Sequence, residues 1–273
     1  MQNSAITTYA ATGGGTEIIM KIGAQLYTLS RQCQTLDNFA DSLARVADMG
    51  YKTVQVSGVC PYEPQWLKEQ LDKNGLTCEL THPSMDRIRD PDKLVADQNV
   101  YSCKYMGVSW MPPEYRGSLE KAKEFCDLFY DSATRIKSLG SQLMYHNHWF
   151  EYDDIGGINF MDYLTERFSP ELLGITLDTY WVEFAGRNVA DEINRLAGRL
   201  PRIHLKDMEI LANGQKRYAP VGYGVMDFEK ICEAAVSAGT EIAFVEQDEC
   251  FERDPFDCLK MSLEYLKSIG YEA

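Results

Sequence analysis

The sequence lacks any long apolar run and any recognisable secretory signal. No uninterrupted apolar run approaches the roughly 18 to 20 residues that a membrane-spanning helix needs. Residues 1–20 also lack the basic start and long apolar centre of a signal peptide, and Gly13, Gly14 and Gly15 are typical of a flexible linker. We therefore expect a flexible extension over residues 1–19, one folded domain over residues 20–273, and a cytoplasmic protein with no membrane partner.

An excess of positive charge is also missing. The chain has 27 Lys and Arg against 41 Asp and Glu, which gives a formal net charge of −14. Because such a surface repels phosphate backbones, we expect no nucleic acid partner. Eight cysteines occur without any C-x-x-C pair. A chain of this length buries enough core to fold without disulfides, so we expect reduced thiols.

What the sequence does have is a regular alternation of short apolar runs with longer stretches of helical period. Clear helical stretches cover residues 36–49, 119–139 and 228–237, and several helical stretches end at a glycine just before the next short run. We interpret the short runs as eight strands: residues 21–26, 52–57, 76–81, 107–111, 142–147, 173–178, 202–205 and 242–246.

Strict alternation of strands and helices requires a parallel sheet, and eight such units in about 250 residues predict a single (β/α)8 TIM barrel. A doubly wound open sheet is the alternative. Its glycine-rich dinucleotide turn is missing, because Gly222-Tyr223-Gly224 lacks the third glycine and does not follow a strand in the required way.

The ends of the predicted strands carry an unusual number of polar and aromatic side chains. In a barrel of this kind the active site forms at the carboxyl ends of the strands. All four histidines of the chain fall there, on three different strands. The residues at strand ends are His82, Trp110, Met111, Tyr145, His146, Asn147, His148, Asp178, His204, Lys206 and Glu246.

Strand alternation allows these side chains to converge on a metal ion. His146 and His148 share a parity, as do His204 and Lys206, so each pair is able to face the barrel mouth. Asp178 and Glu246 each close an apolar strand. There a carboxylate is costly without a compensating cation or hydrogen bonds. Mixed oxygen and nitrogen donors suit a divalent ion such as Mn²⁺, Mg²⁺, Co²⁺ or Zn²⁺.

Five segments give the sequence a specific resemblance. They are YHNHWFEY (145–152), LDTYW (177–181), HLKD (204–207), VGYGVMDF (221–228) and VEQD (245–248). In this order they resemble the xylose-isomerase-like TIM-barrel superfamily, and within it the sugar phosphate isomerase/epimerase group. The likeness runs from about residue 20 to the end of the chain.

The resemblance implies one divalent metal ion, with Mn²⁺ preferred, held by Glu, Asp, His and Glu from successive strands. Asp178, His204 and Glu246 match three of these positions. The usual glutamate of the fifth strand is displaced by the Tyr-His-Asn-His run. We expect Glu151 as the fourth ligand, with His146 or His148 as the alternative.

The resemblance also implies proton abstraction next to the carbonyl of a keto sugar or sugar derivative, through a metal-stabilised enediolate. We expect Glu246 and Glu151 to move the proton, with His148 as a substitute base. We expect the substrate, a small-molecule sugar, to contact the remaining strand-end residues: His82, Trp110, His146 and Lys206. Backbone N–H groups of residues 221–224 are candidates for binding a phosphate, although no arginine cluster lies near them in the sequence. The sequence leaves open a homo-oligomer.

Three other functions compete with a sugar isomerase or epimerase. A lyase or dehydratase acting on a keto-inositol or a 3-keto-glycoside would use the same residues and the same enolate chemistry. A nuclease of the endonuclease IV type needs more histidines than the four present and tolerates a charge of −14 poorly. A sugar-binding barrel without chemistry would have little reason to keep the acidic residues.

Overall fold

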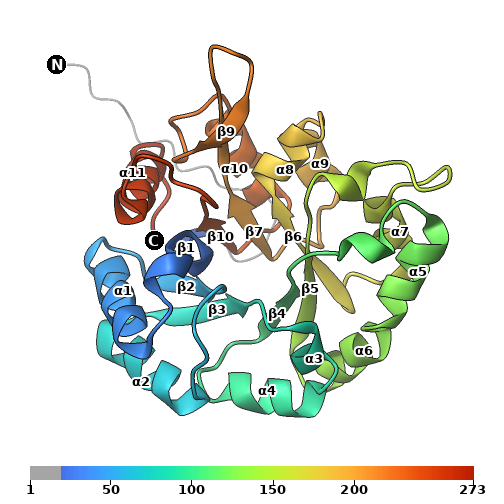
Figure 1. The fold of residues 1–273 in the computed structure, drawn as a ribbon, viewed down its shortest axis with the longest axis horizontal. Coiled ribbons are helices and arrows are strands. Elements are labelled where there is room, and N and C mark those ends of the chain that lie inside the picture. Colours follow the sequence, from blue (N-terminus) through green and yellow to red (C-terminus); the bar gives the residue numbers. More distant parts are fainter. Residues whose placement is uncertain (1–19) are drawn as a thin grey trace, which may run out of the picture.

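The computed structural model describes residues 20–273, which form a closed barrel of eight parallel strands (Figure 1). The predicted (β/α)8 TIM barrel is therefore confirmed, and the expected extension over residues 1–19 lies outside the described residues. Around the barrel the strand order is β1-β10-β7-β6-β5-β4-β3-β2. The barrel strands are β1 (Lys21–Gln25), β2 (Thr53–Val56), β3 (Thr77–Thr81), β4 (Tyr105–Val108), β5 (Gln142–His146), β6 (Leu173–Asp178), β7 (Arg202–Leu205) and β10 (Ile242–Val245).

Helices surround the barrel and cover the outer faces of its strands (Figure 1). The α-helices are α1 (Leu36–Asp48), α2 (Pro64–Asn74), α3 (Met85–Ile88), α4 (Pro91–Asn99), α5 (Leu119–Asp127), α6 (Tyr130–Ser138), α7 (Phe160–Arg167), α8 (Thr179–Phe184), α9 (Val189–Arg195), α10 (Phe228–Ser237) and α11 (Pro255–Ser268). Short 3-10 helices are η1 (Leu26–Gln32), η2 (Pro113–Tyr115) and η3 (Phe150–Tyr152). The single helix predicted over residues 119–139 is two helices, because the backbone leaves helical geometry at the fully buried Phe129 (φ −130°, ψ 3°).

Glycines end the helices as the sequence predicts. Gly75 follows α2 with φ +62°, and Gly140 follows α6 with φ +84°. Both values lie in the left-handed region, which a residue with a side chain rarely adopts. These two glycines therefore turn the chain back toward strands β3 and β5.

The lower part of the barrel interior is filled by apolar side chains. Leu80, Met144, Ile242 and Phe244 form a small cluster there. Glycine makes room for the largest of them, since a Cβ on Gly23 would lie 2.6 Å from the Phe244 ring. The barrel is thus a packed core at this level, and the four histidines lie toward its carboxyl-terminal mouth.

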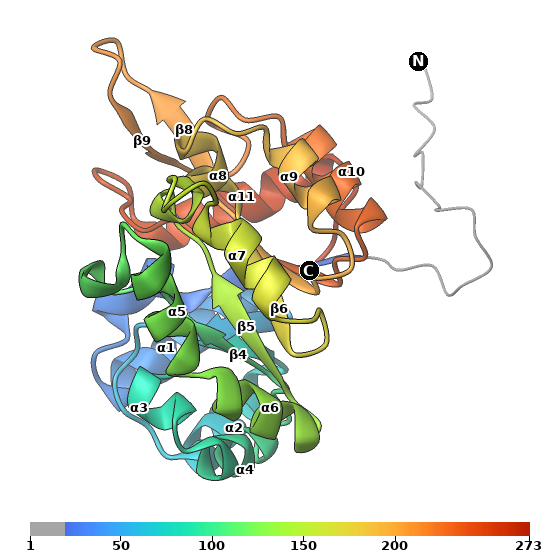
Figure 2. The ribbon, with the colours of Figure 1, turned by 90° about the vertical axis from the view of Figure 1, so that its right-hand side faces the viewer.

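One antiparallel hairpin interrupts the alternation and was not predicted. Strands β8 (Asp207–Ile210) and β9 (Lys216–Ala219) pair with each other outside the barrel sheet. Figure 2 shows this hairpin extending beyond the strand ends, next to α8. It adds to the wall on one side of the barrel mouth.

Two expectations about the chain concern its cysteines and the membrane. Within residues 20–273 all eight cysteines are free thiols, and seven of them are buried. They serve as small apolar side chains of the core, as the sequence predicts. Among the described helices, none combines the length and the apolar character needed to cross a bilayer.

Candidate metal centre

Four side chains at the carboxyl ends of neighbouring strands converge in the barrel mouth. They come from β5, β6 and β7 and from the residue after β10: His146, Asp178, His204 and Glu246. One possible ligand atom from each lies within 4.8 Å of all the others, and all four residues are buried. The pairing of the barrel strands sets this arrangement. Asp178 of β6 pairs with His204 of β7, and His146 of β5 pairs with Thr176 of β6.

The distances within the group suit ligands that share one ion. His204 Nδ1 lies 2.9 Å from Glu246 Oε2 and 3.7 Å from Asp178 Oδ2, and His146 Nε2 lies 3.2 Å from the same Asp178 oxygen. Glu246 Oε2 also lies 3.0 Å from the Lys206 ammonium, and neither this oxygen nor His204 Nδ1 makes a hydrogen bond of good geometry among the described residues. Two buried carboxylates and two imidazole nitrogens that face one another are a donor set that suits a divalent cation, so the residues fit a metal ion.

The charges of the group depend on one another. Burial alone would lower the pKa of His204, but the carboxylates of Glu246 and Asp178 outweigh burial and raise it to about 9. Burial opposes ionisation of Glu246, but Lys206 and His204 hold the pKa of its carboxyl below the usual value. The carboxylates are therefore ionised at neutral pH and ready to bind a cation.

Second partners fix the orientation of both histidines. His204 Nε2 lies 2.7 Å from Gln55 Oε1, and His146 Nδ1 lies 3.0 Å from the carbonyl oxygen of Ser109. Since these oxygens only accept, each ring donates N–H there and turns its other nitrogen toward the metal group, where His204 would release a proton on binding a cation. The Gln55 amide also contacts His82 Nε2 at 3.0 Å, and His82 Nδ1 contacts Ser57 Oγ at 3.2 Å.

Lys206 lies in the middle of the acidic residues. Its Nζ is 2.9 Å from Asp178 Oδ2, 3.0 Å from Glu246 Oε2 and 2.8 Å from Asp248 Oδ1. Burial would lower the pKa of this lysine, but the three carboxylates keep it well above its usual value. The ammonium group thus balances the buried negative charge of these carboxylates next to the metal group.

Glu151, the expected fourth ligand, lies elsewhere. Its Oε1 accepts a hydrogen bond from the Tyr145 hydroxyl at 2.7 Å, and its Oε2 accepts one from the backbone N–H of His148 at 2.8 Å. Tyr145 points out of the barrel, where it packs on Phe125 and Phe160. The short helix η3 therefore carries Glu151 to the outer side of β5, and the alternative ligand, His146, takes its place in the group.

His148 and the tryptophans surround the metal group. The His148 ring stacks on Phe150 at 5.3 Å between centroids and 7° between planes, and its Nδ1 has no partner among the described residues. Burial and the nearby His146 lower the pKa of His148 to about 2, so its ring is neutral. Trp110 is 47% exposed and Trp181 only 8%, which places Trp110 at the rim and Trp181 in the wall.

A cavity of about 400 Å³ opens over these residues. The sequence predicted five of its lining residues and missed the others, among them Tyr27 and Asp248. Gln55, which contacts His204 and His82, was missed as well. The lining consists of Tyr27, Ser57, Gly58, His82, Ser109, Trp110, His146, His148, Glu246 and Asp248.

The backbone of residues 221–224 has another role than the one considered from the sequence. The Asp207 carboxylate accepts hydrogen bonds from the N–H groups of Gly222 and Gly224, both at 2.9 Å, and from those of Met208 and Met226. These N–H groups are therefore already satisfied within the chain, and the loop offers little to a phosphate.

Fold and site together define a TIM barrel with a mixed histidine and carboxylate centre at its mouth. The chain belongs to the family described as xylose isomerase-like TIM barrel, whose sequence model matches residues 43–269.

Three known proteins illustrate the similarity. An inosose dehydratase of Geobacillus thermodenitrificans is 24% identical over 267 residues, covering 84% of this chain and 89% of that protein. A crystal structure of a sugar phosphate isomerase/epimerase from Parabacteroides distasonis shares 22% identity, with a TM-score of 0.76, 91% of this chain and 98% of that chain. A D-allulose 3-epimerase from Methylomonas sp. shares 15% identity, with a TM-score of 0.70, 92% of this chain and 98% of that one.

Proposed function

We propose that this protein is a divalent-metal-dependent sugar isomerase or epimerase that acts on a keto sugar or a sugar derivative. The observation that carries the proposal is the convergence of His146, Asp178, His204 and Glu246 within 4.8 Å at the barrel mouth. We assign these four residues as the metal ligands. The names of the similar proteins, which include epimerases and dehydratases of small polyols and sugars, support the same choice.

A bound divalent ion would act as a Lewis acid on the carbonyl and neighbouring hydroxyl oxygens and stabilise an enediolate by several kcal/mol. Glu246 is the base that removes the proton next to the carbonyl, because its carboxylate is ionised and faces the cavity. Lys206 binds the oxygen on which negative charge develops. His82 and Trp110 contact the sugar from the opposite wall.

Isomerisation and epimerisation need a second group that returns the proton. Because Glu151 is held by Tyr145 and the His148 backbone, this role falls to the His148 side chain. Its Nδ1 is buried and without a partner, and the residue lines the cavity. Because its ring is neutral, we infer that it passes a proton on as a relay, accepting one at one nitrogen as it gives up another at the other.

Elimination is the second candidate, and one observation favours it: Glu151, the second carboxylate base expected for a two-base epimerase, is held outside the group by Tyr145 and the His148 backbone. In that reaction Glu246 takes the proton next to the carbonyl and the C–O bond at the following carbon breaks. The leaving oxygen takes a proton from the Lys206 ammonium. The similarity to inosose dehydratase over 84% of the chain points the same way.

The test is a panel of keto sugars and keto-inositols incubated with the metal-loaded protein in D₂O. The proposal predicts deuterium at the carbon next to the carbonyl, in a recovered isomer or epimer of the substrate. Release of water or an aglycone together with an unsaturated ketone would instead assign the lyase. If no compound of the panel gains deuterium, enolisation is not the reaction of this site.

A further inference from the structure

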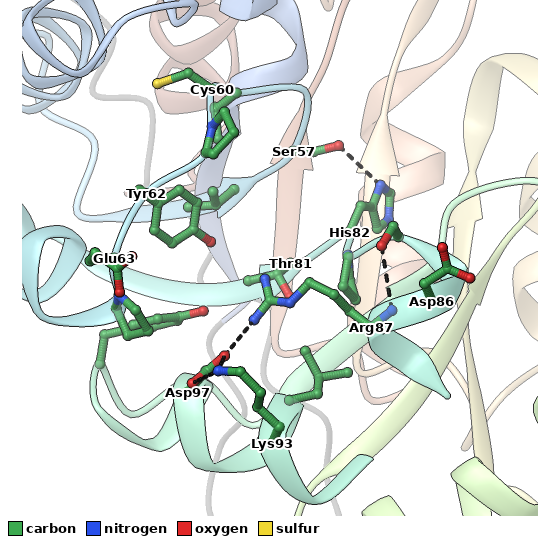
Figure 3. Close-up of a pocket in the computed structure, with 18 of the residues that line it drawn as sticks. Ser57, Cys60, Tyr62, Glu63, Thr81, His82, Asp86, Arg87, Lys93 and Asp97 are labelled. Carbon is green, nitrogen blue, oxygen red and sulfur yellow. Dashed lines mark hydrogen bonds and ion pairs between the residues drawn. The ribbon is translucent and has the colours of Figure 1, made fainter. Parts of the chain in front are cut away.

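A second and larger cavity adjoins the catalytic one. It has a volume of about 670 Å³ and lies between the loop after β2 and the segment from the end of β3 to α4 (Figure 3). Ser57, Gly58 and His82 line both this cavity and the 400 Å³ cavity over the metal group. The two cavities therefore border each other at these three residues. We call this larger space the annex.

The annex combines an aromatic wall with a polar one. Figure 3 shows Cys60, Tyr62 and Glu63 on one side and Arg87, Lys93 and Asp97 on the other. Binding sites for small molecules have this character, with mostly apolar walls and a few fixed polar groups. The volume also falls within the range of about 300 to 1,000 Å³ that such sites occupy.

The charges of the annex argue against an anionic ligand. Both of its cations are paired with one acid: Arg87 Nη2 lies 3.0 Å and Lys93 Nζ 2.9 Å from Asp97 Oδ2. Further acids line the same space: Glu63, Asp86 and Asp90. A phosphate would find neutralised cations and an excess of negative charge there.

A hydroxyl group, in contrast, suits this wall. The guanidinium and ammonium groups donate, the Asp97 carboxylate accepts, and a hydroxyl does both. Asp97 is held in place by both cations, and its side chain is only 18% exposed. The Tyr62 ring, which packs on Phe39 at 6.0 Å between centroids, supplies an apolar face.

We propose that the annex binds an uncharged, hydroxyl-bearing second ring of the substrate. The enzyme then acts on a keto sugar that is joined to another ring, in preference to a free monosaccharide or a sugar phosphate. This inference rests on the proposed function, because the metal group binds the ring that carries the ketone.

The test compares three probes in the D₂O exchange assay: a keto-hexose, the same keto-hexose glycosidically joined to an unmodified glucose ring, and the keto-hexose phosphate. We expect kcat/KM for exchange to be about tenfold or more higher for the two-ring compound, the effect of one or two hydrogen bonds. Arg87→Ala and Asp97→Asn should remove that advantage and leave exchange in the one-ring compound unchanged. The matched control is Arg135→Ala. Arg135 lies on α6, outside the annex, and pairs with Asp92 of α4, the helix that also carries Asp97.

Equal kcat/KM for one and two rings, or a preference for the phosphate, would overturn the proposal. An equal loss of kcat/KM for the one-ring and the two-ring sugar in Arg87→Ala would also overturn it. Calorimetric binding of unreactive cellobiose and of methyl glucoside separates this proposal from the proposed function. Tighter binding of cellobiose that depends on Arg87 supports the annex even if no probe exchanges deuterium, whereas equal binding of the two contradicts it.

Discussion

At the scale of the residue, the least expected feature of the site is Gln55. Its amide lies between His204 and His82, with Oε1 2.7 Å from His204 Nε2 and Nε2 3.0 Å from His82 Nε2. The residue does not touch the proposed metal position, but it determines which nitrogen of His204 faces the other ligands. Gln55 is therefore a positioning residue of the site.

Replacing Gln55 by leucine keeps the size of the side chain and removes both hydrogen bonds. We expect Gln55→Leu to weaken metal binding by about 10- to 100-fold, as loss of such outer partners does. Competition with a metal-binding dye measures this constant without any substrate. Gln142→Leu is the control, since Gln142 lies at the opposite end of a barrel strand and bonds the carbonyl of Pro170. Equal affinities in wild type and Gln55→Leu would refute the assignment.

Glu151 lies away from the position that the sequence analysis expected for it. The sequence places it three residues after His148, close enough to bend back toward the metal. In the structure Glu151 lies on the outer side of β5, because the Tyr145 side chain points outward from that strand and its buried hydroxyl donates a hydrogen bond to the Glu151 carboxylate. Strand periodicity predicts that Tyr145 and His146 point to opposite faces of β5. The direction of the short turn at η3, in contrast, depends on contacts with residues distant in sequence.

Glu151→Gln should therefore keep metal content and deuterium exchange close to wild type. Its amide replaces both hydrogen bonds, with Oε1 accepting from His148 N–H and Nε2 donating to the Tyr145 oxygen. A loss of exchange by about 10² or more, with substrate binding retained, would return Glu151 to the role of base that the sequence suggested.

Glu151 should also make the stability of the wild-type protein depend on pH, and Glu151→Gln should remove this dependence. Burial raises the pKa of Glu151 from 4.5 to about 7, so the folded state holds its proton longer than the unfolded state. The wild-type free energy of unfolding should then fall as pH rises from about 4.5 past 7, by up to about 3 kcal/mol from this group. Urea unfolding at pH 5 and pH 8 should show this fall relative to Glu151→Gln. Parallel pH dependence of the two proteins would contradict the assignment.

At the scale of the element, the sequence predicts the barrel strands well and their connections poorly. The runs of β6 and β10 are apolar on both faces because helices cover the sheet outside and side chains fill it inside, and that pattern is visible in the sequence. The strand predicted over residues 107–111 is β4, two residues earlier (Tyr105–Val108). The β8–β9 hairpin was missed because it is short, partly exposed, and stabilised by Asp207 rather than by an apolar pattern.

Substitution of Asp207 tests whether its carboxylate holds the loop after this hairpin in place. Asp207→Ala leaves four buried or half-buried N–H groups without their acceptor, and we expect it to lower the free energy of unfolding by about 2 to 4 kcal/mol. Asp154→Ala is the matched control, because Asp154 accepts from Gly156 and Gly157 in an exposed turn and should cost under about 1 kcal/mol. Equal losses in urea unfolding would contradict this account of the loop.

At the scale of the whole molecule, eight strands from a span of more than 220 residues bring the four proposed ligands together. Three of the four proposed ligands follow from strand ends alone, because a closed parallel barrel places all carboxyl ends in one ring. The fourth proposed ligand, the annex and the contacts of Gln55 with His204 and His82 depend on side-chain packing, which a single sequence does not contain. The cytoplasmic location and any oligomer stay predictions.

A metal that binds only the folded barrel should stabilise it. At a free Mn²⁺ concentration 100 times the dissociation constant, the stabilisation is about 2.7 kcal/mol, which corresponds to a rise in Tm of about 5 °C for a domain of this size. Scanning calorimetry with and without a chelator measures it. Asp178→Ala should show no such rise, and a rise of the same size in that variant would place the ion elsewhere.

The central claim is that one ion held by His146, Asp178, His204 and Glu246 supports proton abstraction from a keto sugar. The most direct measurement titrates metal-free protein with Mn²⁺ while following deuterium exchange into a keto sugar that the panel has identified. The account predicts that exchange rises linearly and levels off at one ion per chain, and that His204→Ala shows neither tight binding nor exchange. Full exchange without metal, or unchanged binding and exchange in His204→Ala, would contradict it.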